Sequence, residues 1–395
     1  MIKKMLVVFL LLGFLVGSVS AKGVSLLVDK LKDKGVLTQA EVDDIWGHKE
    51  GHEKPCKSWI KFSGYFRLRY QRDELMGYDR DRFRMMFKLK GKTEIAEDLK
   101  LGFGIATGDW NPRSRNVTMD YTFEKKMIML DHVYVKKIFP EVLPDKTLKL
   151  IAGKFSNKKF IWKPTDMLWD TDINIEGVGA HLKCEKTDWD LFLNTGLFVM
   201  DHRGSEGNAT MFLIQPVAML DVGELTRLKV AASYYHFDDA KGNTYLYSPG
   251  SNSVDLYGNL TNDFNPIVLA AKMVVDDWFL WWEQYGFFGE YVLNPDPSSD
   301  NQGFSAGVFF GPKKIKETGE CKLKLMFREL QKDAWLDVLP DLDAMGGMTD
   351  SQGIELIFKY GIAKNTYLAF DYYRMGNIGK SNKKDLVQID LGMKF

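Results

Sequence analysis

Three residues near the start of the chain have side chains that commonly bind metals. His48, His52 and Cys56 are spaced four apart, which on a helix would place all three on one face. Gly51 and Pro55 interrupt that helix, and no fourth ligand lies nearby in the sequence. The sequence therefore predicts no metal site here.

A second group has the spacing of calcium ligands. In "DTDINIE", the first alternate positions of a calcium loop hold Asp170, Asp172, Asn174 and Glu176. Ile175 stands where that loop needs its turn glycine, and the twelfth position is His181 instead of glutamate. The pattern is more typical of a structured acidic loop.

Catalysis and cofactor binding have no sequence support. The chain has six histidines, and none accompanies a nucleophile motif. A net charge of zero argues against nucleic acid as a partner. Three cysteines are too few, and odd in number, for a disulfide scaffold. We therefore expect no enzyme, no cofactor, no metal and no nucleic-acid partner.

The elements that must position the remaining polar residues show a period of two. In "IKFSGYFRLRYQ", apolar side chains from Ile60 to Tyr70 alternate with polar ones from Lys61 to Gln71, with only Gly64 and Tyr65 departing from type. Such alternation indicates strands with one apolar and one polar face. About 16 such segments follow one another, many near the length of a tilted membrane-spanning strand: 59–72, 82–95, 98–107, 126–137, 147–155, 176–185, 188–199, 210–221, 225–237, 266–276, 278–291, 302–312, 321–332, 352–360, 366–374 and 385–395.

The connections between these segments alternate in length. Tight turns such as "AED" and "EKTD" alternate with long polar loops at 108–125, 156–175, 238–265 and 333–351. A soluble β-sandwich also has alternating strands, but so many strands would need a very large core or a bilayer. The pattern predicts an all-β fold, a transmembrane antiparallel β-barrel spanning 59–395.

The N-terminal region has two predicted parts. Lys3 and Lys4, an apolar run over 5–16 and "GSVSA" predict a signal peptide, 1–21, cleaved after Ala21. Residues 22–58 form a predicted periplasmic helical hairpin and linker, in which Gly35 ends the first helix. Thr38 and Glu41 make a capping box for the second. This hairpin could dock under the barrel, pair with other copies or act as a spacer toward the cell wall.

Several stretches carry a family resemblance. "LGFGIATGDWNPRSRNVTMDYTFEKKMIMLDHVYV", "AGKFSNKKFIWKPTDMLWDTDINIEGVG" and "MGGMTDSQGIELIFKYGIAKNTYLAFDYYRM" resemble the putative porin family of Gram-negative outer membranes. The layout is more distantly similar to phosphate-selective porins, without a specific arginine ladder. The final "LVQIDLGMKF" resembles the terminal strand that barrel-assembly machinery reads, which would make Phe395 its contact. The resemblance implies a diffusion channel in the outer membrane, in contact with lipid and lipopolysaccharide.

Strand parity predicts which side chains line the lumen, where they would set selectivity. The predicted pore-lining basic residues are Arg67, Arg69, Arg82, Arg84, Lys88, Lys90, Arg227, Lys229, Lys324 and Arg328. Fewer acids share the inward parity, among them Glu290, Glu355, Asp371 and Asp390. The excess of cations predicts a weak preference for anions.

The third outer loop, 156–175, combines apolar and acidic side chains. We expect it to fold into the lumen, because so many apolar groups are not stable in water. The expected constriction residues are Trp162, Asp166, Trp169, Asp170, Asp172 and Glu176. Their carboxylates would face Arg67, Arg69, Arg82 and Arg84.

Two functions remain open from the sequence. The first is an outer-membrane porin for passive diffusion of small hydrophilic solutes or ions. The second is a structural or adhesive barrel plugged by its own loops. By analogy with porins of this strand number, a homotrimer is an expectation for the assembly.

Overall fold

The computed structural model describes residues 32–33, 59–75, 78–143, 145–204, 207–277, 279 and 282–395. The chain divides into two compact units, Met1–Lys57 and Ser58–Phe395. In the first unit only Lys32 and Asp33 are described, and both are helical. The signal peptide, the hairpin as a whole and the group His48, His52 and Cys56 lie outside the described residues.

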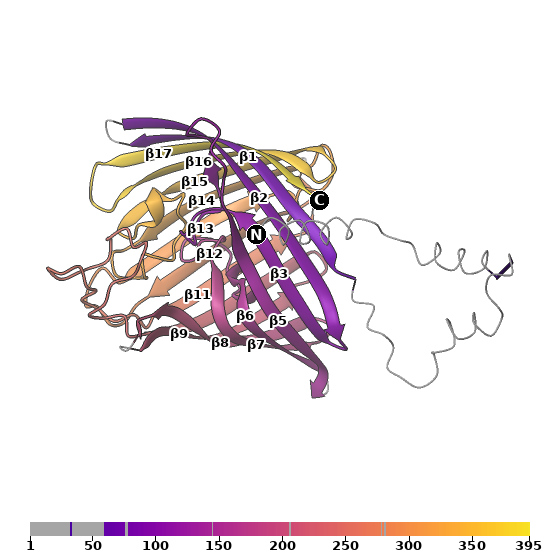
Figure 1. Ribbon diagram of the computed structural model, residues 1–395. Coiled ribbons are helices and arrows are strands. Elements are labelled where there is room, and N and C mark those ends of the chain that lie inside the picture. Colours follow the sequence, from indigo (N-terminus) through magenta and orange to yellow (C-terminus); the bar gives the residue numbers. More distant parts are fainter. Residues whose placement is uncertain are drawn as a thin grey trace, which may run out of the picture. The chain divides into compact units, whose positions relative to one another are not determined.

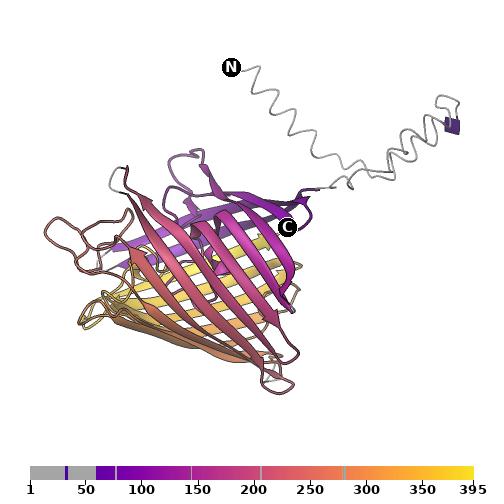
Figure 2. The ribbon, with the colours of Figure 1, turned by 90° about the horizontal axis from the view of Figure 1, so that it is seen from below.

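The second unit is one closed antiparallel β-barrel (Figures 1 and 2). β1 pairs with both β2 and β17, so the described sheet has no free edge along its length. The strands are β1 (Lys61–Leu75), β2 (Tyr78–Ala96), β3 (Leu99–Thr107), β4 (Val117–Thr118), β5 (Ile128–Leu143), β6 (Lys146–Ser156), β7 (Asn174–Glu185), β8 (Trp189–His202), β9 (Asn208–Asp221), β10 (Thr226–Asp238), β11 (Ile267–Val275), β12 (Tyr285–Leu293), β13 (Gln302–Phe310), β14 (Cys321–Leu330), β15 (Ser351–Ala363), β16 (Thr366–Asn377) and β17 (Lys383–Lys394). β4 has two residues, and the other sixteen form the wall. The prediction of an all-β barrel of about this strand number is confirmed.

Alternation explains the two faces of the wall. On β1, Leu68 is exposed while Arg69, Gln71 and Asp73 are buried inside the barrel. The same pattern recurs on β10, where every second residue from Ala231 to Phe237 is buried. The outer face is therefore apolar and the inner face largely polar, as a lipid-spanning barrel requires.

The last residue completes the closure of the barrel. The backbone N–H of Gly64 donates to the carbonyl oxygen of Phe395 at 2.7 Å, and the N–H of Phe395 donates to the Gly64 carbonyl. The Phe395 ring lies over Gly64, where an added Cβ would stand 2.0 Å from the ring atom Cζ. Glycine at 64 thus makes room for the terminal aromatic ring.

Two strands differ from the prediction. The segment expected at 278–291 becomes strand only from Tyr285; before it, Phe279 and Trp282 form an isolated antiparallel bridge with each other. β4 was not expected. It arises because β3 stops at Thr107 while β2 continues, and Val117–Thr118 pair with the β2 edge left at Arg84 and Met85.

The two ends of the barrel differ in their connections. Long segments at 108–127, 157–173, 239–266 and 331–350 lie at one end, here called the loop end. Short turns such as 97–98 and 364–365 lie at the other, the turn end. The third loop begins with the short helix α4 (Asn157–Phe160), and loop 331–350 contains the 3-10 turn η3 (Met345–Gly347). No helix among the described residues is long and apolar enough to cross a membrane.

Candidate functional site: the barrel lumen

The third loop, 157–173, crosses the lumen. Its Trp162 backbone exchanges two hydrogen bonds with Gln215 of β9, both 2.8 Å. Asp166 pairs with Arg328 of β14 at 3.4 Å, and Asp172 pairs with Lys88 of β2 at 3.3 Å. These three strands lie far apart around the sheet, so the loop narrows the barrel from inside.

An aromatic cluster fixes this loop against its neighbours. Trp169 and Trp335, of loops 157–173 and 331–350, are both 1% exposed or less, with ring centroids 6.1 Å apart. Trp335 also packs edge-on against Tyr235 and Phe237 of β10 at 4.9 and 5.5 Å. Met167 and Leu168 are buried in the same cluster. The burial of these large side chains fixes the third loop in place, and no bound ligand is needed for this.

Two carboxylates of loop 331–350, Asp333 and Asp337, join it to loop 239–266. Asp333 accepts from the Ser253 N–H at 2.8 Å and from the Asn262 side chain at 3.0 Å. Asp337 accepts hydrogen bonds from the Ser248 hydroxyl at 2.8 Å, the Ser251 N–H at 2.8 Å and the Asn252 N–H at 3.2 Å. The Asn252 side chain in turn donates to the carbonyl of Trp335 at 2.9 Å. We call the three joined loops, 157–173, 239–266 and 331–350, the loop plug.

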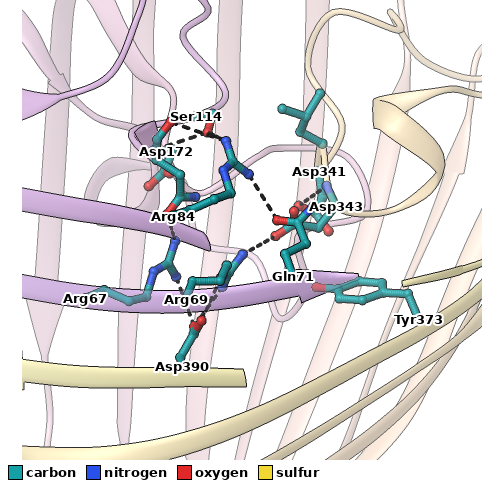
Figure 3. Close-up of polar contacts among 12 residues, drawn as sticks. Arg67, Arg69, Gln71, Arg84, Ser114, Asp172, Asp341, Asp343, Tyr373 and Asp390 are labelled. Carbon is teal, nitrogen blue, oxygen red and sulfur yellow. Dashed lines mark hydrogen bonds and ion pairs between the residues drawn. The ribbon is translucent and has the colours of Figure 1, made fainter. Parts of the chain in front are cut away.

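Four of the arginines of β1 and β2 face the lumen: Arg67, Arg69, Arg82 and Arg84. Figure 3 shows Arg67, Arg69 and Arg84 beside acids of the plug. Arg69 forms two hydrogen bonds to Asp390 of β17, at 2.6 and 2.8 Å, and reaches Asp343 at 3.3 Å. Arg67 also reaches Asp390, at 3.4 Å. Arg82 pairs with Asp73 at 2.8 Å.

Arg84 differs from the other three arginines. Its guanidinium donates to the Gln71 side chain at 3.1 Å and to the Asn116 carbonyl at 3.2 Å. Among the described residues no carboxylate lies within 4.0 Å of it. The field across this part of the lumen therefore comes from cations partly neutralised by wall acids and by Asp343.

The third-loop acids have other partners than expected. Asp172 contacts Lys88 and Arg115, and Asp166 contacts Arg328. None of the four lumen-facing arginines named above pairs directly with Asp166 or Asp172. The reason is position: the loop approaches the wall at β2 and β14, whereas Asp390 lies directly opposite Arg69 in the β1–β17 register.

The structure corrects the predicted position of Glu176 in the constriction. Glu176 lies in β7, on the face that carries the exposed Val178, and pairs with Lys154 at 2.5 Å. Its neighbour Ile175 is buried in the core of the loop plug. The strand begins at Asn174, so parity turns Glu176 outward and away from the constriction.

Other predicted lumen residues have identifiable partners. Lys324 pairs with the buried Glu355 at 3.3 Å. Lys229 lies 5.1 Å from the ring centroid of Trp162. Arg227 lies close to the turn end and forms an ion pair with Asp221 at 2.9 Å. About half of the Arg227 side chain is exposed. Lys90 lines a cavity under the third loop.

Burial and neighbouring charges displace the pKa values of the loop groups. Burial, with the nearby Asp172, raises the pKa of Asp170 to about 8. Burial, with Asp166 and Asp343, also raises the pKa of Asp341. Burial lowers the pKa of Lys163 to about 7. Asp172 behaves oppositely: burial opposes its ionisation, but Lys88 and Arg115 hold its pKa below the usual value.

Four site residues were missed from the sequence. Arg115 bridges Asp131 and Asp172, and Arg113 donates to the carbonyls of Asp337 at 2.9 Å and Tyr247 at 2.7 Å. Asp341 and Asp343 approach Arg328 and Arg69 from loop 331–350. All four lie in loops, where no alternation reports which way a side chain points.

Like charges lie side by side on the lumen wall toward the turn end. Cross-strand register places lysines directly opposite one another, although such pairs are destabilising by themselves. The pairs are Lys229–Lys272, Lys322–Lys359, Lys100–Lys136 and Lys61–Lys92. Among the described residues, only Lys100 of these eight has a carboxylate within 4.0 Å, Glu94.

Comparisons with known proteins agree with this geometry. The closed barrel and narrowed lumen define a porin-type channel. The chain matches the family described as "putative porin" over residues 74–263 and 264–395, and it belongs to that family.

Solved structures with a similar fold have little sequence in common with the chain. OprB of Pseudomonas putida, in a high-pH structure, is 11% identical with a TM-score of 0.56, covering 85% of this chain and 94% of its own. A triple mutant of the Rhodopseudomonas blastica porin is 9% identical with a TM-score of 0.46, covering 85% and 100%. None of the curated proteins compared with the chain matches it. At these identities the likeness to OprB is one of fold.

Proposed function

We propose that this protein is an outer-membrane channel for passive diffusion of small hydrophilic solutes, with a weak preference for anions. The observation that carries the preference is the set of lysine pairs on the lumen wall. Of these eight adjacent amines, only Lys100 has a carboxylate within 4.0 Å among the described residues, so the pairs leave positive potential in the lumen, which concentrates anions there. Lysines placed opposite each other cost stability, so their presence on four strand pairs favours a functional reason.

The proposal includes the setting of the channel. Residues 1–21 are a signal peptide, 22–58 a periplasmic hairpin and linker, and 59–395 the barrel. The loop end faces outward and the turn end faces the periplasm. Phe395 is the contact for the barrel-assembly machinery, and the barrels associate as homotrimers, which light scattering of purified protein would test.

Reversal potentials in planar bilayers under a KCl gradient test the anion preference. Replacing the pairs Lys229–Lys272 and Lys322–Lys359 with glutamine should shift the potential toward cations. The matched control replaces two outward-facing lysines, Lys137 and Lys154, with glutamine and should leave the potential unchanged. The proposal would be contradicted if the lysine-pair variant and the control variant shifted the potential equally, or if neither shifted it.

The loop plug favours a second candidate function. Its aromatic cluster and the Asp337 hydrogen bonds could hold the lumen shut, which would suit a structural or adhesive barrel. Single-channel recording separates the two. Steady current from folded protein supports the channel, and persistent silence supports the plugged barrel.

A further inference from the structure

A cavity of about 440 Å³ lies between the third loop and the inner face of β2, β5, β6 and β7. Its roof is α4, and its walls are strand residues toward the turn end. We call it the basic chamber. The cations that line it are Lys88, Lys90, Lys92, Arg115, Lys136, Lys149, Lys158 and Lys159.

Among the described residues, two carboxylates line the basic chamber, and both have partners. Asp131 pairs with Arg115 and, at 3.0 Å, with His132. Asp172 pairs with Lys88 at 3.3 Å and with Arg115. Among the described residues, no carboxylate lies within 4.0 Å of the remaining cations, Lys90, Lys92, Lys136, Lys149, Lys158 and Lys159.

These six amines come from four separate elements, so folding has gathered them. Their mutual repulsion is visible at the roof. Burial, together with the nearby Lys92, Lys90 and Lys136, lowers the pKa of Lys159 to about 8. Neutral polar residues would serve equally well to line a lumen whose only requirement was to be filled with water.

We propose that the basic chamber binds a compact oligoanion, a solute carrying three or more negative charges on phosphate or carboxylate groups. A monovalent anion would neutralise one amine and leave the remaining amines repelling one another. An oligoanion can engage several flexible lysine side chains at once, each as a charge-assisted hydrogen-bond donor. This deepens the proposed function, on which it rests for the entry of the solute into the lumen, by giving the class of anion.

The test is calorimetric titration of the folded, detergent-solubilised protein with tripolyphosphate, citrate and orthophosphate. Tripolyphosphate or citrate should bind at least about tenfold more tightly than orthophosphate, since each added charged hydrogen bond contributes. Comparison of the two oligoanions shows whether phosphate or carboxylate is preferred. Equal affinities for all three anions would overturn the proposal.

Variants assign the binding to the basic chamber. Lys136→Gln with Lys149→Gln and Lys159→Gln should weaken oligoanion binding about tenfold or more, whereas Lys137→Gln with Lys154→Gln should not. Heat-modifiable migration on gels confirms that each variant is folded. Unchanged affinity in the folded triple variant would also overturn the proposal.

Channel currents separate this proposal from the proposed function. Tripolyphosphate added to wild-type channels should block the chloride current, and the triple variant should need about tenfold more for the same block. Channels that conduct salt while the protein binds no oligoanion would refute the chamber site alone. Silent barrels that still bind oligoanion tightly would refute the channel and leave the site standing.

Discussion

At the scale of single residues, the displaced pKa values in the third loop predict a pH effect on selectivity. Below about pH 7 Lys163 is charged and Asp170 is neutral; above about pH 8 the reverse holds. Both changes remove positive charge from the lumen as pH rises. The reversal potential should therefore move toward cations between pH 6 and pH 9.

The contribution of Asp170 to this effect can be isolated. Asp170→Asn cannot ionise. Its single side-chain oxygen can accept from only one of the N–H groups of Asp172 and Leu342, which bond to different oxygens of the Asp170 carboxylate. At pH 6 its reversal potential should equal that of the wild type, and by pH 9 it should have moved less. A wild-type potential that does not change with pH would show that these groups do not influence permeating ions.

A second residue-scale prediction concerns Gly64. Gly64→Val adds side-chain atoms where the Phe395 ring lies, within 2.0 Å at Cβ alone. The clash should reduce the fraction of barrel that migrates as folded protein on unheated gels, at a cost of about 1–3 kcal/mol. Adding Phe395→Leu should restore part of this fraction, because the smaller side chain leaves space. Purely additive losses would argue against the contact.

At the scale of elements, Asp337 contributes to holding loop 239–266 against loop 331–350. Asp337→Ala leaves the N–H groups of Ser251 and Asn252 without their acceptor, a loss of about 1–3 kcal/mol for each buried donor. Loop 239–266 should separate from loop 331–350 and become sensitive to protease. The single-channel conductance should then rise. The control Asp263→Ala, at an exposed position of loop 239–266, should change neither the protease sensitivity nor the conductance. An Asp337→Ala channel with wild-type conductance would mean that the plug does not limit the current.

At the scale of the whole molecule, the anion preference should depend on salt. The wall lysines act on ions through the water of the lumen, and the screening length falls from about 30 Å at 0.01 M to about 3 Å at 1 M salt. The ratio of chloride to potassium permeability should therefore be largest in dilute salt and decline as salt rises. A ratio independent of salt would indicate selection by size or by direct contact instead of by the wall charges.

The sequence by itself determined the wall of this protein. Alternation has the period of the strand, so each segment reports its own inward and outward faces without reference to any partner. That is why Arg67, Arg69 and Lys88 could be placed in the lumen before the fold was known. Glu176 shares the outward parity of Val178, and grouping it with the acids of the preceding loop placed it on the wrong side of the wall.

Only the tertiary structure decided which charges meet. Arg69 finds Asp390 and Asp343 across 321 and 274 positions of sequence, and Asp172 finds Arg115 from a different loop. Barrel closure sets the first contact and loop packing sets the others. A loop has no repeating geometry, so its side chains are directed by what they pack against. Partners brought together by packing leave no local pattern in the sequence.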